Sequence, residues 1–196
     1  RLHYQLIDLD RARLGTGALP GLLQAVRAMG FLGVNITYPC KQAVMPLLDD
    51  LSDEARAIGA VNTVVCREGR LHGHNTDGSG WAWGFQRALP QADLSRIVLL
   101  GCGGAGAAVA DAVLRLGAGE LRLGDLDGAR PAELSRRLAE RFGTARVRPA
   151  ASLDEAMPGA SGLIHATPTG MDKLPGSAVP VRWLVPGLWV SVVVYF

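Results

Sequence analysis

Two polar segments in the first half of the chain hold the residues best suited to chemistry. "NITYPCK" (35–41) and "GAVNTV" with "GHNTDGSG" (59–64 and 73–80) each place Asn and Thr beside one charged residue. Amides and hydroxyls suit a small polyhydroxylated substrate, and a lysine held by a carboxylate can transfer a proton. Lys41 and Asp77 are the natural pair for that transfer, whereas a lysine without such a partner would be interpreted as a solvated surface residue.

A glycine-rich loop in the second half of the chain is typical of dinucleotide binding. "GCGGAG" follows the apolar run "RIVLL" and opens a helical pattern. Gly101 permits a tight turn, Gly103 lets the backbone approach a pyrophosphate, and Gly106 lets helix and strand pack closely. The free N–H groups of the helix N-terminus attract the anion. The predicted cofactor-binding residues of this loop are Gly101, Gly103, Gly104, Ala105 and Gly106.

An acidic residue stands where a dinucleotide fold places its ribose ligand. Asp125 follows Gly106 by 19 positions, within "LGDLD". Its carboxylate can accept hydrogen bonds from ribose hydroxyls and would repel a 2′-phosphate, which favours NAD over NADP. Arg130 leaves the alternative open, because a nearby arginine can accept a 2′-phosphate. Asp127 either shares the ribose role or is a solvated turn residue.

Alternating strands and helices must position these groups. In the first half we expect a strand at 4–9, a helix at 18–30, a strand at 31–37, a helix at 41–51 that Pro46 may interrupt, a helix at 52–59 opened by Ser52, a hairpin at 60–75 turning at Glu68-Gly69, and a helix at 78–89. In the second half we expect strands at 96–101, 120–127, 161–167 and 188–195, with helices at 107–117 and 129–143.

This order predicts an α/β protein with two domains. Residues 1–90 would form an N-terminal α/β substrate-binding, catalytic domain, and residues 91–196 a Rossmann-like, parallel-sheet dinucleotide-binding domain. The apolar run near residue 190 needs cover on both faces. We therefore expect the sequence to be an excerpt of a longer protein or a chain with undescribed ends.

Composition narrows the classes of partner. The 196 residues are 48% hydrophobic and 19% charged, with a net charge of +2, so neither a basic nucleic-acid stripe nor a membrane span is predicted. Cys40, Cys66 and Cys102 are scattered and odd in number, which favours a reducing cytoplasm. His72 and His74 lack an obvious third ligand, so no metal site is predicted.

The motifs together resemble one family. "NITYPCK", "GAVNTV", "GHNTD", "GCGGAG" and "HATPTGM" stand in the order and approximate spacing of the shikimate/quinate dehydrogenases, over essentially the whole chain. "TYPCKQ" and "DLD" look most like the quinate/shikimate branch that uses NAD. The resemblance implies hydride transfer between NAD(P) and a ring hydroxyl of shikimate or quinate, giving the 3-dehydro ketone. A homodimer is a further possibility.

The resemblance also assigns roles to single residues. It implies that Lys41 and Asp77 relay the proton. The residues implied to hold the substrate are Thr37, Asn62, Asp77 and Tyr195, and those implied to hold the cofactor outside the glycine loop are Asp125, Arg130, Thr167 and Met171. Asn75 shares a substrate motif and either contributes to it or only shapes the turn.

Departures from the family pattern leave alternatives open. His165 stands where the family has Asn, and Val192 where it usually has Asp. The family's serine-rich substrate motif and its C-terminal helices fall outside this sequence, so we expect both domains to be incomplete. A non-catalytic dinucleotide-binding remnant or regulatory module is therefore the alternative function. A folate-linked reductase would share the glycine loop, but "NITYPCK" and "NTD" argue against it.

Overall fold

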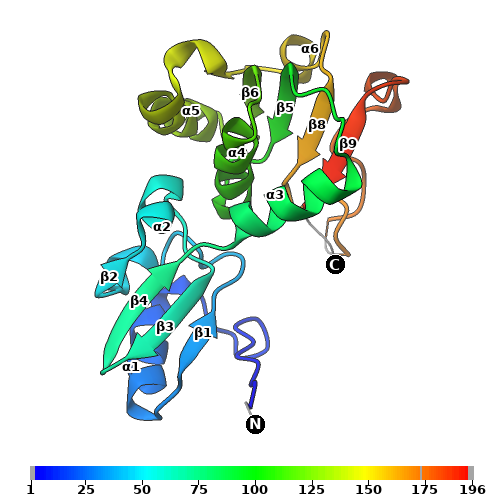
Figure 1. Cartoon of the computed structure of the whole chain (residues 1–196). Coiled ribbons are helices and arrows are strands. Elements are labelled where there is room, and N and C mark those ends of the chain that lie inside the picture. Colours follow the sequence, from blue (N-terminus) through cyan, green and yellow to red (C-terminus); the bar gives the residue numbers. More distant parts are fainter. Residues whose placement is uncertain (1–2, 173, 194–196) are drawn as a thin grey trace.

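The computed structural model describes residues 3–172 and 174–193, which form two β-sheets with flanking helices (Figure 1). The strands are β1 Gly33–Asn35, β2 Asp50–Leu51, β3 Thr63–Arg67, β4 Arg70–His74, β5 Arg96–Leu100, β6 Glu120–Gly124, β7 Val147–Pro149, β8 Gly162–His165 and β9 Trp189–Val192. The α-helices are α1 Leu19–Ala28, α2 Asp53–Ile58, α3 Asp77–Ala88, α4 Gly104–Arg115, α5 Ala129–Phe142 and α6 Leu153–Ala156. Short 3₁₀ turns lie at Thr16–Ala18, Met45–Leu47, Thr144–Arg146 and Val181–Trp183.

The first sheet has the order β1-β3-β4-β2 and is mixed. The predicted hairpin is confirmed: Glu68 and Gly69 both adopt positive φ, 52° and 73°, as a tight two-residue turn requires. The helix predicted at 52–59 is also confirmed, since α2 spans Asp53–Ile58. The Ser52 hydroxyl caps this helix by accepting a hydrogen bond from the Ala55 N–H.

Two predicted elements of the first half are wrong. The segment 41–51 forms turns, a 3₁₀ turn and β2 instead of a helix. Pro46 lacks an N–H and clashes with the preceding turn, so it prevents helix propagation here. The segment 4–9 forms no strand, and Tyr4 and Leu6 are exposed. An apolar run becomes a strand only where another strand completes its hydrogen bonds, and none of the described strands pairs with it.

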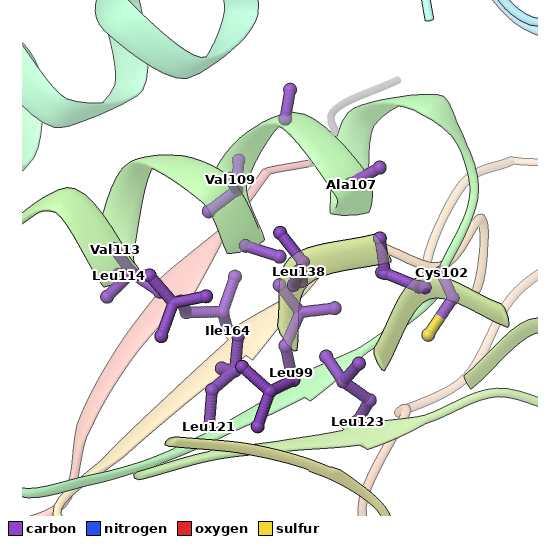
Figure 2. Close-up of a cluster of buried hydrophobic side chains, with 14 of the residues drawn as sticks. Leu99, Cys102, Ala107, Val109, Val113, Leu114, Leu121, Leu123, Leu138 and Ile164 are labelled. Carbon is purple, nitrogen blue, oxygen red and sulfur yellow. The ribbon is translucent and has the colours of Figure 1, made fainter. Parts of the chain in front are cut away.

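The second sheet has the order β7-β6-β5-β8-β9, and all its strands are parallel. Its central strand β5 is buried on both faces, as its continuous apolar sequence predicted. Ile97 and Leu99 join one buried cluster, whereas Val98 and Leu100 join another. Figure 2 shows Val113 and Leu114 of α4 beside Ile164, and all three belong to the first of these clusters. Each such side chain contributes about 1.5–3 kcal/mol through burial.

Helix α3 connects the two halves. It follows the first sheet directly, yet its Trp81 packs against the core of the second sheet. Figure 1 shows α3 beside α4. Residue 90, the predicted domain boundary, lies between α3 and β5. The short elements β2, β7 and α6 were not predicted, because two to four residues carry too little periodicity. None of the helices in the described ranges is long and apolar enough to cross a bilayer.

Candidate active site

Lys41 and Asp77 form an ion pair. The Nζ of Lys41 lies 2.5 Å from Oδ2 of Asp77, and the two side chains are 18% and 25% exposed. Such partial burial weakens solvent screening, so the pair is held more firmly than an ordinary surface pair. Asp77 is also the first residue of α3, where the helix dipole stabilises a carboxylate. Lys41 is not at a helix N-terminus, because the helix predicted to begin there does not form.

A network of amide side chains fixes the carboxylate of Asp77. Asn62 donates from Nδ2 to Oδ1 of Asp77 at 2.9 Å and to the hydroxyl of Thr76. The Asn62 side-chain oxygen Oδ1 accepts the Thr76 N–H. The Asn62 amide therefore both donates to and accepts from the turn that precedes α3. One Asp77 oxygen therefore faces Asn62 while the other faces Lys41.

Asn75 shapes the turn, which was one of the two roles considered for it. It is almost fully buried, its Oδ1 accepts the Asp77 N–H, and its Nδ2 donates to the Ala60 carbonyl. An Asn side-chain oxygen that accepts the N–H of the residue two positions later is typical of an Asx turn, so this contribution to the site could be predicted from "NTD". The contribution of Ala60 carries no such signal in the sequence.

Backbone hydrogen bonds hold the Lys41 segment. The Lys41 carbonyl accepts the Val61 N–H at 2.8 Å, which ties the turn to the start of β3. Thr37 lies at the exposed rim of the same turn, and its carbonyl accepts the Cys40 N–H. The predicted residues Thr37, Lys41, Asn62 and Asp77 thus belong to one turn-and-hairpin unit.

The glycine loop has the conformation of a βα turn. Gly101 has φ 98°, and a Cβ there would lie 2.6 Å from the Ala166 backbone. A Cβ at Gly106 would collide with the Gly101 carbonyl, so this residue allows helix and strand to meet. Gly103, in contrast, is open and immediately precedes the N–H groups of α4. These features fit a dinucleotide pyrophosphate, because the backbone is accessible where the helix begins.

Asp125 lies at the end of β6 and binds the glycine loop. Its Oδ2 accepts the Cys102 N–H at 2.7 Å, and its Oδ1 accepts the Asp127 N–H. Asp127 forms an ion pair with Arg130 at 3.2 Å. Leu126, between the two aspartates, is fully exposed. Arg130, the first cationic residue after Asp125 in the sequence, is thus already paired with a carboxylate.

A second loop borders the glycine loop through the Ala166–Thr167 backbone. The buried His165 contacts the Thr167 hydroxyl through Nε2 at 2.6 Å, and burial lowers the pKa of the imidazole. Met171 forms a bridge with Leu174 in the same loop. Val192 is exposed at the end of β9, and the predicted substrate residue Tyr195 lies outside the described residues.

Metal-binding groups are not gathered anywhere in residues 3–172 and 174–193: no three His, Cys, Asp or Glu side chains there are placed to hold an ion.

Comparison with known proteins gives consistent matches. The family described as "Shikimate dehydrogenase substrate binding domain" matches residues 1–64. Shikimate dehydrogenase (NADP(+)) of Streptomyces avermitilis is 51% identical over 197 residues, covering 100% of this chain and 68% of the relative. Quinate/shikimate dehydrogenase (NAD(+)) of Corynebacterium efficiens is 44% identical, covering 98% and 69%. The structure of quinate dehydrogenase from Corynebacterium glutamicum in complex with NAD superimposes with a TM-score of 0.81 at 42% identity, covering 90% of this chain and 64% of that one.

The parallel sheet, its glycine loop and the neighbouring Lys–Asp pair define the class of NAD(P)-dependent dehydrogenases. With these relatives, the chain belongs to the shikimate/quinate dehydrogenase family, and the prediction from its motifs is confirmed. The chain spans about two thirds of the length of the relatives it matches. The relatives are named as enzymes, which favours a catalytic function over a non-catalytic remnant.

Proposed function

We propose that the protein, in its full-length form, transfers a hydride between NAD and a ring carbon of shikimate or quinate. The observation that carries the proposal is the 2.5 Å ion pair of Lys41 and Asp77, located next to the glycine loop. The names of the relatives support the same substrates.

In this proposal the chain's own residues move the proton. The nicotinamide supplies the hydride acceptor or donor when the cofactor is bound. During oxidation, the substrate hydroxyl loses its proton to the Lys41–Asp77 pair while its carbon loses a hydride. During reduction, the Lys41 ammonium donates a proton to the oxygen of the ketone. Positioned proton transfer of this kind accelerates a reaction by about 10²–10⁴-fold.

We assign residues 1–90 to substrate binding and residues 91–196 to cofactor binding. Thr37 and Asn62 present a hydroxyl and an amide beside the relay, which suits the hydroxyls of a small ring acid. Thr167 and Met171 lie in the loop that adjoins the glycine loop, which suits contact with the nicotinamide ribose. Tyr195 is retained as a substrate residue on the family resemblance alone.

NAD is proposed as the preferred dinucleotide. Asp125 places a carboxylate at the end of β6, and the ion pair of Arg130 with Asp127 reduces its availability for a 2′-phosphate. Leu126 offers no charge to such a phosphate. The relatives include proteins named for NADP(+) and for NAD(+), so their names leave this preference open.

The experiment is a hydride-transfer assay on the full-length natural protein. Shikimate or quinate is supplied with NAD or NADP, and the absorbance of the reduced nicotinamide is monitored. Turnover with NAD and one of the acids is expected. Absence of turnover with all four combinations, from folded protein that binds NAD, would instead support the non-catalytic alternative. A homodimer and a cytoplasmic location stay predictions, to be tested by light scattering and by fractionation.

A further inference from the structure

Gly104, the first residue of α4, lies directly against the stem of Lys41. A Cβ added to Gly104 would be 3.0 Å from the Lys41 Cβ, 3.4 Å from its Cδ and 3.3 Å from the Ala60 Cβ. Ordinary carbon–carbon contacts are about 3.5–4.0 Å. Gly104 has a helical backbone, not a positive φ, so its conformation does not require glycine. The reason for glycine here is the space taken by Lys41 and Ala60.

Neither neighbour can retreat easily. The Lys41 Cβ is attached to a backbone whose carbonyl accepts the Val61 N–H at 2.8 Å. Ala60 is fully buried, and its carbonyl accepts the Nδ2 of Asn75 at 3.0 Å. Closely packed interiors respond to an added methyl by shifting backbone or rotamers. The segment that would have to shift is the one that aims the Lys41 side chain.

The same helix also touches the segment of Asp77, one turn further along. A Cβ at Gly78 would lie 2.8 Å from the Ala108 carbonyl of α4. Gly78 immediately follows Asp77 at the start of α3, and α3 lies beside α4 in Figure 1. Helix α4 therefore lies beside both partners of the relay: Gly104 lies against the Lys41 side chain, and Ala108 lies against Gly78, the residue that follows Asp77.

We propose that Gly104 is a positioning residue for the proton relay. Its missing side chain lets the first turn of the nucleotide helix fit against the Lys41 stem, so that the loop receiving the dinucleotide and the group moving the proton are held at a fixed separation. This inference rests on the proposed dehydrogenase function. It assigns to Gly104 a role toward Lys41 in addition to any contact with the cofactor.

Gly103 provides the matched comparison. It is the adjacent glycine of the same loop, yet a Cβ there would meet no atom of the chain within 4 Å. Gly103→Ala therefore alters the open surface that would face the pyrophosphate, whereas Gly104→Ala alters the packing against Lys41. Gly84→Ala, in the middle of α3 and also without a close neighbour, controls for introducing a methyl into a helix.

The kinetic experiment compares these three variants in the full-length protein at saturating substrate. For Gly104→Ala we expect kcat to fall about 3- to 10-fold, because contacts of 3.0–3.4 Å require a shift of a few tenths of an ångström and a misplacement of about 1 Å can cost about 10²-fold. The Kd for NAD should change only a few-fold, and the solvent deuterium isotope effect on kcat should rise as proton transfer becomes slower. Gly103→Ala should mainly raise the Kd for NAD, and Gly84→Ala should resemble the wild type in both kcat and Kd.

A double-mutant cycle on stability gives a readout that does not depend on turnover. Lys41→Gly removes the Cβ that Gly104→Ala would meet, so the stability loss from Gly104→Ala should be smaller in the Lys41→Gly background than in the wild type. Equal losses of stability in both backgrounds would overturn the proposal. This test applies even if Gly104→Ala alone is too unstable for kinetic measurements. An unchanged kcat and isotope effect for folded Gly104→Ala would overturn it as well. An inactive wild type would instead refute the dehydrogenase function.

Discussion

The Lys41 ammonium and the Asp77 carboxylate meet at 2.5 Å although they are 36 positions apart in the chain. Between them lie α2 and the hairpin of β3 and β4, which return the chain to the Lys41 turn. Lys41 is fixed by its backbone bond to Val61, and Asp77 by the side chains of Asn62 and Asn75. The pair is therefore built by long-range contacts within the first half of the molecule.

Replacing Lys41 should remove turnover and spare cofactor binding. Lys41→Met keeps most of the apolar stem but removes the charge and the proton, so kcat should fall about 10²–10⁴-fold. The Kd for NAD, measured by quenching of tryptophan fluorescence, should stay close to that of the wild type. Arg27→Met is the control, because it breaks a comparable 2.6 Å ion pair with Asp49 away from the relay. Wild-type turnover in Lys41→Met would eliminate Lys41 as the proton-transfer group.

Asp77→Asn tests the negative charge of Asp77, because the amide has nearly the same shape as the carboxylate. The amide keeps an oxygen for the hydrogen bond from Asn62 but removes the charge that faces Lys41. We expect kcat to fall about 10- to 10³-fold with little change in the unfolding midpoint. Steady-state kinetics and thermal unfolding of the same preparation measure both quantities. A loss of stability that fully accounts for the lost activity would contradict a role in proton transfer.

Asp125→Asn should shift dinucleotide preference toward NADP. Removing the carboxylate charge relieves repulsion of a 2′-phosphate, so the ratio of kcat/KM for NADP to that for NAD should rise about tenfold or more. Part of the change will be a weaker loop, since Asp125 also accepts the Cys102 N–H. Glu140→Gln is the control, because it removes an exposed carboxylate near the end of α5 that has no part in the proposed cofactor site. An unchanged ratio in Asp125→Asn would remove this residue as the determinant of preference.

Glu120 should make stability depend on pH in the acid range. Hydrogen bonds from Arg122, and then from Arg148 and Arg96, lower the pKa of Glu120 from 4.5 to about 2. A lowered folded-state pKa stabilises the fold above the unfolded pKa, and this stabilisation is lost as the pH falls from about 4.5 to 2.

Glu120→Gln should therefore be less stable than the wild type at neutral pH, by about 1–2 kcal/mol after allowance for solvent screening. The difference should shrink as the pH falls to about 2. Urea unfolding at a series of pH values tests this, with Glu140→Gln on the exposed face of α5 as the control. A difference that is the same at every pH would show that Glu120 acts through packing alone.

Cys102 should resist alkylation although it lies in the glycine loop. Burial, and then the charge of Asp125, raises the pKa of the Cys102 thiol to about 12, so its thiolate is about 10³-fold rarer than that of an ordinary cysteine. Treatment of folded protein with iodoacetamide near pH 8, followed by peptide mapping, should leave Cys102 unmodified. Unfolded protein should be modified at Cys102 under the same conditions. Rapid modification in the folded state would indicate that the loop opens.

Local chemistry in the sequence determined much of the fold. Ser52 predicted the cap of α2, Glu68-Gly69 the hairpin turn, and the continuous apolar run of β5 a strand buried on both faces. The cap and the turn depend on hydrogen bonds or steric limits within a few residues, which are visible in the sequence. The burial of β5 could be predicted because a strand covered on both faces has a continuous apolar sequence.

Tertiary structure decided the rest. The segment 4–9 has the composition of a strand but no described strand pairs with it, and the segment 41–51 has helical spacing but turns at Pro46. The sequence by itself supplied the identities of Lys41, Asp77 and the glycine loop. Only the folded chain shows that Gly104 lies against Lys41, because that fit depends on the distance between segments which no local pattern encodes.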